Sequence, residues 1–120
     1  MINFNSGLSH WQKGESKMDL NEALKMLANP TRRAILAWLA NPNEAFKDYT
    51  QLYPYEMYGV CASLIQDKVG LSQPATSLCL KALQDANLVE STKVGKWTYY
   101  KRNSTVVEQV LATLREVLSE

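Results

Sequence analysis

The sequence predicts a mostly α-helical domain with one small β-hairpin, which lies toward the C-terminal end of the chain. Apolar residues recur at helical spacing in five separate segments, and residues that cap or stop helices bound these segments. Between residues 88 and 101 the pattern changes to two short runs rich in Val, Thr, Trp and Tyr around a glycine, as in a hairpin. With 120 residues, of which 46% are hydrophobic, the chain can form one domain with its own core.

Composition excludes several classes of protein. Residues 1–17 show no sustained period, so we expect a flexible N-terminal arm before a domain of residues 18–120. No apolar run reaches the roughly 18 residues of a membrane span, and the polar N-terminus has no signal core. Two cysteines are too few for a disulfide framework, which favours the cytoplasm. His10 is the only histidine, and no nucleophile–base pair, phosphate loop or carboxylate pair has a recognisable spacing. We therefore expect no enzyme and no cofactor.

Caps and breaks place the first three helices. Asp19 and Glu22 have the spacing of a capping box, which predicts the start of the first helix. Asn29 can cap a second helix, and Pro30 suits its first position. A third helix is expected over about residues 58–69, after an irregular stretch.

The next helix completes a helix-turn-helix. Gly70 is suited to the left-handed conformation that ends a helix. Ser72 is a strong N-cap for a helix over residues 72–86, which ends near Asn87. Two helices joined by so short a turn have the spacing of a DNA-binding helix-turn-helix.

A hairpin and a last helix follow this motif. Strands are expected over residues 88–92 and 97–101, joined by a loop of residues 93–96. Thr105 and Glu108 form a second capping box, after which a wide apolar stripe begins. The order is four helices, two strands and a helix, which is the order of a winged helix-turn-helix with the hairpin as its wing.

The helix over residues 72–86 has two stripes. One is expected to face the core and consists of Thr76, Leu80, Leu83 and Asn87. Gln73, Ser77 and Lys81 form the other, which a helix in the major groove presents to DNA. Gln73 can bond an adenine edge, Ser77 can donate or accept, and Lys81 suits phosphate. A solvated surface helix would have a similar polar stripe. Leu78, beside it, can touch a thymine methyl group or pack on a neighbouring element.

Cations concentrate around the hairpin. Residues 59–104 carry six cations and three anions, whereas residues 105–120 have a net charge of −2. This imbalance fits a surface that binds polyanions, or ordinary variation of a solvated surface. Lys93 and Lys96 at the hairpin tip suit phosphate or minor-groove contacts. The expected DNA-binding residues are Ser72, Gln73, Thr76, Ser77, Lys81, Lys93 and Lys96.

Three segments resemble the ArsR (ArsR/SmtB) family of winged helix-turn-helix transcriptional regulators: residues 28–36 (ANPTRRAIL), 70–77 (GLSQPATS) and 95–100 (GKWTYY). The resemblance spans about residues 18–120. It implies a homodimer built from the first and last helices, a palindromic operator in double-stranded DNA, and release by a metal or another signal. The last helix has apolar residues at three-four-three spacing, which suits a helix–helix seam or a face buried within one subunit. The expected interface residues are Leu20, Leu24, Val107, Val110, Leu114 and Val117.

The family's metal sites are incomplete in this sequence. One family site places two cysteines one residue apart on the helix before the turn, where this chain has Cys61 and Ser63. Another uses histidines and carboxylates on the last helix, which here has no histidine. We therefore assign no metal site. Cys61 and Cys79 remain candidates for a redox pair or an intersubunit cysteine site, although Cys79 can equally be a small buried hydrophobe.

The predicted function is a dimeric, sequence-specific DNA-binding transcriptional repressor. It inserts the helix over residues 72–86 into the major groove and uses the hairpin over residues 88–101 as its wing. The aromatic residues between 46 and 58 either cap the core or line a pocket for an unidentified small effector. The alternative function is a winged helix that binds proteins without reading DNA. Salt titration of DNA binding separates the two, because phosphate contacts give a steep salt dependence.

Overall fold

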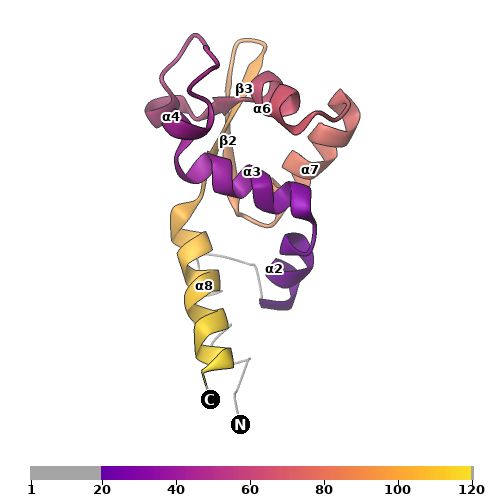
Figure 1. Ribbon diagram of the computed structural model, residues 1–120, viewed down its shortest axis with the longest axis vertical. Helices are drawn as coiled ribbons and strands as arrows, with labels where there is room; N and C mark the ends of the chain where they lie inside the picture. Colours follow the sequence, from indigo (N-terminus) through magenta and orange to yellow (C-terminus); the bar gives the residue numbers. More distant parts are fainter. Residues whose placement is uncertain (1–19, 120) are drawn as a thin grey trace.

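The computed structural model describes residues 20–119, so the expected arm over residues 1–17 and the cap at Asp19 lie outside the described residues. Its elements are α2 (Leu20–Leu27), α3 (Pro30–Ala40), α4 (Pro42–Ala45), α5 (Tyr55–Tyr58), β1 (Val60–Cys61), α6 (Ala62–Val69), α7 (Gln73–Asp85), β2 (Val89–Val94), β3 (Trp97–Arg102) and α8 (Ser104–Leu118). The hairpin and the pair α6–α7 lie toward one end, and α8 extends toward the other (Figure 1). The predicted helical fold with a hairpin wing is confirmed. Within residues 20–119, no helix has both the length and the apolar character to cross a membrane.

The junction between α2 and α3 is capped as the sequence predicts. The Asn29 side-chain oxygen accepts hydrogen bonds from the backbone N–H groups of Thr31 at 2.8 Å and Arg32 at 3.1 Å. Pro30 occupies the first turn of α3, where a missing N–H costs nothing. The Asn29 side chain therefore pairs two N–H groups of the first turn of α3 that have no partner within the helix.

The aromatic segment between α3 and α6 packs into the core. Phe46 is fully buried, and its ring makes edge contacts with Trp38 and Tyr49 at centroid distances of 6.1 and 5.5 Å. The Tyr55 hydroxyl donates to the carbonyl oxygens of Phe46 and Tyr49. These contacts support the structural interpretation of this segment, with Phe46 as its anchor.

The third predicted helix begins later than expected. Tyr58 closes the short helix α5, Gly59 follows, and Val60 enters a two-residue strand, so α6 starts only at Ala62. Val60 is fully buried and lies opposite Tyr100 of β3, where pairing with the hairpin is available only in the folded chain. The boundary at Tyr58 was wrong because this pairing outweighs local helical preference.

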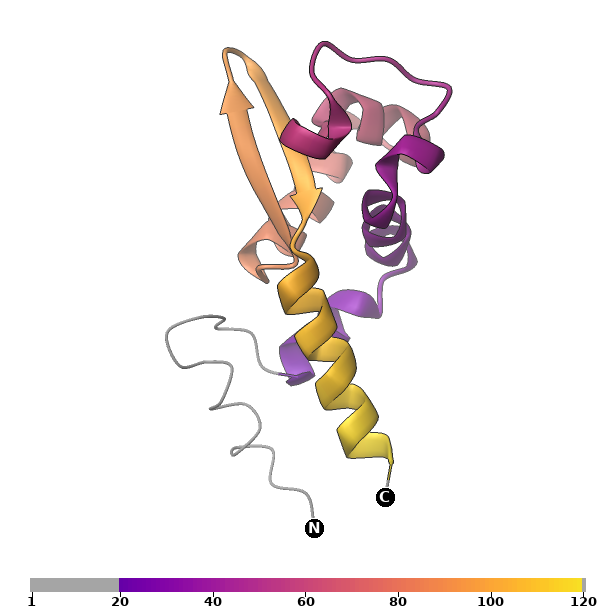
Figure 2. The same cartoon turned by 90° about the vertical axis from the view of Figure 1, so that its left-hand side faces the viewer.

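The three strands form an antiparallel sheet in the order β1-β3-β2. Val94 pairs with Trp97, which leaves a two-residue turn in place of the longer loop expected over residues 93–96. Gly95 takes the first position of this turn with a φ of 60°, as in a type II′ turn. Figure 2 shows β2 and β3 as one long hairpin, with this turn at its tip.

The end of α7 is closed by a left-handed residue. Asn87 has a φ of 64° and donates its backbone N–H to the Gln84 carbonyl at 2.9 Å. The Leu88 N–H reaches the Leu83 carbonyl at the same distance. This pair of bonds is a Schellman motif. It turns the chain directly from α7 into β2, the first strand of the wing.

Candidate nucleic-acid interface

The start of α7 is built by its cap. The Ser72 hydroxyl accepts a hydrogen bond from the Ala75 N–H at 3.2 Å, and Pro74 lies in the first turn. Thr76 is 3% exposed, and its hydroxyl donates to the Ser72 carbonyl at 2.9 Å. The burial of Thr76 leaves little of its side chain for the expected contact with DNA, which stays a prediction. Its side chain closes the first turn from the core side, as its place on the core-facing stripe indicates.

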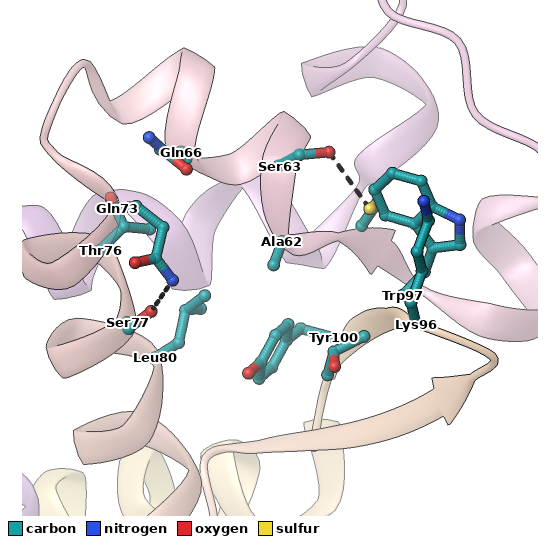
Figure 3. Close-up of a pocket in the computed structure, with 12 residues that line it drawn as sticks. Ala62, Ser63, Gln66, Gln73, Thr76, Ser77, Leu80, Lys96, Trp97 and Tyr100 are labelled. Atoms are coloured by element: carbon teal, nitrogen blue, oxygen red, sulfur yellow. Dashed lines mark hydrogen bonds between the residues drawn. The ribbon is translucent and has the colours of Figure 1, made fainter.

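The polar stripe of α7 is open to solvent. Gln73 and Ser77 are both exposed, and the Gln73 side-chain amide donates to the Ser77 hydroxyl at 2.9 Å across one helical turn (Figure 3). This bond fixes the orientation of the two side chains relative to each other. Both side chains carry groups that can hydrogen-bond to base edges. Further along, the Lys81 ammonium pairs with Asp85 at 3.1 Å, so the last turn carries a neutralised cation.

Leu78 stands clear of the domain. Its side chain is 71% exposed, beside the Gln73–Ser77 pair and away from the buried stripe of Leu80 and Leu83. Packing on a neighbouring element of its own subunit is therefore wrong for Leu78. The open position leaves an apolar contact with a thymine methyl group available.

A cleft of about 310 Å³ separates the start of α7 from the wing. Figure 3 shows Gln73 and Ser77 on one side of it and Lys96 and Trp97 on the other. Several of its polar or aromatic lining residues were not predicted from the sequence, because nothing there shows which residues of α6 and β3 face α7: these are Ser63, Gln66, Trp97, Thr98 and Tyr100.

The wing tip combines cations with an aromatic ring. Lys93 and Lys96 are exposed, and neither belongs to an ion pair within residues 20–119. The Lys96 ammonium lies over the Trp97 ring, 5.3 Å from its centroid. Trp97 itself is 44% exposed. The tip therefore offers positive charge and one flat apolar surface at the mouth of the cleft.

Hydrogen-bonding chemistry in the cleft is neutral apart from Lys96. Burial raises the pKa of the Tyr100 phenol above its ordinary value, so the hydroxyl stays protonated and can donate. Hydroxyls, amides, the Cys61 thiol and the Trp97 indole supply the other polar groups, and none of the carboxylates within residues 20–119 lines the cleft. Such a surface can hydrogen-bond to phosphates and base edges without repelling an anionic backbone.

The two cysteines are free thiols. Cys61 is buried at the N-terminal end of α6, with its sulfur 3.2 Å from the Ser63 hydroxyl, while Cys79 is half-buried on α7. Among residues 20–119, no group of three or more His, Cys, Asp or Glu side chains could hold a metal ion.

The residues expected at a subunit interface separate into two groups. Leu20, Val107 and Val110 are at most 8% exposed within their own subunit, so their side chains present little surface to a second copy. Val107 and Val110 pack in the core cluster together with Ala23 of α2, which crosses α8. Beyond that crossing, apolar side chains of α2 and α8 remain partly or largely exposed: Leu24, Leu111, Leu114, Val117 and Leu118.

Comparison of the sequence with known proteins finds two informative relatives, although no family model matches the chain. The uncharacterized HTH-type transcriptional regulator YbzH of Bacillus subtilis is 34% identical over 98 residues, which are 82% of this chain and 97% of the relative. A Halobacterium salinarum protein named as arsenical resistance operon repressor ArsR2 is 32% identical over 96 residues, which are 80% of this chain and 68% of that protein.

Solved structures agree with these relatives. NolR of Sinorhizobium fredii matches with a TM-score of 0.54 and 30% identity, over 82% of each chain. The solution structure of Mb0332 from Mycobacterium bovis, described as a homodimeric winged helix-turn-helix DNA-binding domain, matches with a TM-score of 0.54 and 25% identity, over 83% of this chain and 78% of that one. Because both the sequence and the arrangement of its elements match, this chain belongs to the ArsR family of winged helix-turn-helix transcriptional regulators and is not an enzyme.

Proposed function

We propose that the protein is a dimeric, sequence-specific DNA-binding transcriptional repressor of the cytoplasm. In each subunit the N-terminal half of α7 enters the major groove, and the β2–β3 wing contacts the adjacent backbone or minor groove. The observation that carries this proposal is the exposed Gln73–Ser77 pair, which shares a cleft with Lys96 at the wing tip. Base-reading groups and a cation thus lie on two walls of one concave surface.

The dimer supplies the second recognition helix. The exposed apolar residues of α2 and α8 give a second copy a surface to pack on, and the family relative Mb0332 is described as a homodimer. A two-fold axis through this surface would place two copies of α7 in successive major grooves, about one helical turn apart. The operator would then be a palindrome, and an effector that changed the angle between subunits would lower the affinity for DNA.

Footprinting of fragments selected from genomic DNA provides the operator and tests the proposal directly. We expect two protected half-sites related by two-fold symmetry. Replacing both Lys93 and Lys96 with alanine should weaken binding to every sequence. It should also flatten the plot of log affinity against log salt by about 0.9 for each phosphate that the wing no longer neutralises. As a control, Lys47→Ala removes an exposed cation that does not line the cleft and should leave the slope unchanged.

Direct readout predicts a different behaviour for Gln73. Gln73→Ala should cost about 1–3 kcal/mol for each half-site of the footprinted operator and relax the base preference there. Affinity for random DNA should stay nearly constant. Gln84→Ala is the matched control, because Gln84 is an exposed glutamine on the same helix whose amide bonds to Ser91 of the wing at 2.9 Å. Equal losses on operator and random DNA would contradict base reading by Gln73.

A winged helix that binds proteins without reading DNA is the competing function. It predicts no selected DNA fragment, a shallow salt dependence, and no effect of the lysine substitutions on any partner bound elsewhere. The footprint and the salt titration therefore decide between the two functions with the same protein preparation.

A further inference from the structure

A second cavity, of about 200 Å³, lies between α3, the end of the hairpin and α8. Its wall is largely apolar, with Leu36, Val107, Val110 and Leu111 among its residues, and Arg33 and Arg102 also line it. Figure 2 shows α8 beginning directly at the end of β3, which brings these elements together. The cavity shares no residue with the cleft beside α7.

The two arginines are held in place by the backbone. Arg33 donates one guanidinium N–H to the Leu27 carbonyl at 2.7 Å, and Arg102 donates one to the Leu36 carbonyl at 2.9 Å. These bonds orient each guanidinium yet use one of its five N–H donors. Within residues 20–119, neither arginine has a carboxylate partner. Two oriented cations thus border an apolar cavity without an anion.

We infer that this cavity binds a small apolar carboxylic acid. The apolar part of such a ligand would cover the apolar cavity wall and exclude water from it. Its carboxylate would accept paired hydrogen bonds from a guanidinium group, the geometry that arginine prefers. A cavity of about 150 Å³ accommodates benzene, so the cavity here, of about 200 Å³, suits a single aromatic ring or a short aliphatic chain. Arginine orients a planar anion better than a lysine would, which favours a carboxylate over a neutral ligand.

Occupancy would act on the same helix that we propose for dimerisation. Leu111 lines the cavity and is also 44% exposed on the apolar stripe of α8. A ligand seated between α3 and α8 would therefore set the angle of α8 against the winged part of the subunit. This regulatory consequence rests on the proposed function, whereas binding of the acid does not.

Calorimetric titration of the full chain with benzoate tests the inference, with benzamide as the neutral probe of the same shape. Benzoate should bind at least tenfold more tightly than benzamide. Arg102→Gln and Arg33→Gln should each weaken benzoate binding at least tenfold. Lys47→Gln removes an exposed cation outside the cavity lining and should not change it. Arg33 is exposed, so its variant answers the question even where loss of the Arg102–Leu36 bond lowers stability.

Three results would overturn the inference. Equal affinities for benzoate and benzamide would mean that the site does not recognise a carboxylate. An equal loss in Lys47→Gln would mean that net charge alone explains the effect. If only a monomeric variant bound benzoate and the wild-type chain did not, the second copy would be filling the cavity in the dimer. A separate titration of operator DNA, with and without benzoate, measures the coupling. If no DNA is bound at all, the proposed function fails while the calorimetry still decides whether the acid binds.

Discussion

Gly59→Ala is expected to lower the free energy of unfolding by about 3 kcal/mol. Gly59 has a φ of 89° and a ψ of −161°, a backbone region that is essentially restricted to glycine. A Cβ atom there would also collide with the carbonyl oxygen of Tyr100 and with the Lys101 side chain. Because Gly59 connects α5 to β1, relief of the collision would pull β1 away from β3 and disturb the floor of the cleft beside α7.

Urea denaturation of the variant and the wild-type chain measures this decrease. Gly70→Ala is the matched control, because Gly70 also has a positive φ, of 78°, yet nothing lies within 4 Å of the position of an added Cβ. Gly70→Ala should therefore cost only about 1 kcal/mol, from backbone strain alone. A cost for Gly59→Ala no larger than that of the control would mean that β1 and β3 can separate without penalty.

Leu114→Asp should convert the proposed dimer into a monomer and reduce operator affinity about 100-fold or more. Leu114 is half-buried on the second half of α8, beyond the part that packs on its own core. Because a two-fold interface contains each residue twice, the substitution would remove two carboxylates from water and would place them near each other. Each half-site would then be bound separately, which removes the gain of about 10²–10⁴ that a linked second site provides.

Analytical ultracentrifugation gives the oligomeric state, and titration of the footprinted operator gives the affinity. Ala112→Asp places the same carboxylate on the opposite, exposed face of α8 and should change neither quantity. Circular dichroism of both variants checks that the subunit remains folded. A Leu114→Asp chain that stays dimeric would place the subunit interface elsewhere than on this stripe.

Local signals in the sequence were sufficient for the helices that surround the turn. Ser72 caps α7, Gly70 ends α6 in the left-handed region, and Asn29 with Pro30 divides α2 from α3, all as predicted. These features depend on hydrogen bonds between residues at most four positions apart. The residue types at those positions are therefore enough to predict them. The same holds for the exposure of Gln73 and Ser77, which follows from helical periodicity.

Long-range packing settled the remaining features. Val60 forms a strand because β3 offers it a partner 40 positions away in the chain, and the cleft exists because the Schellman turn at Asn87 brings the wing back beside α7. Along α8, one continuous apolar stripe is core at Val110 and open surface at Leu118, because among residues 20–119 the buried cluster extends along this helix only as far as Val110. Periodicity indicates which face of a helix is apolar, but it carries no information about the neighbour that covers that face.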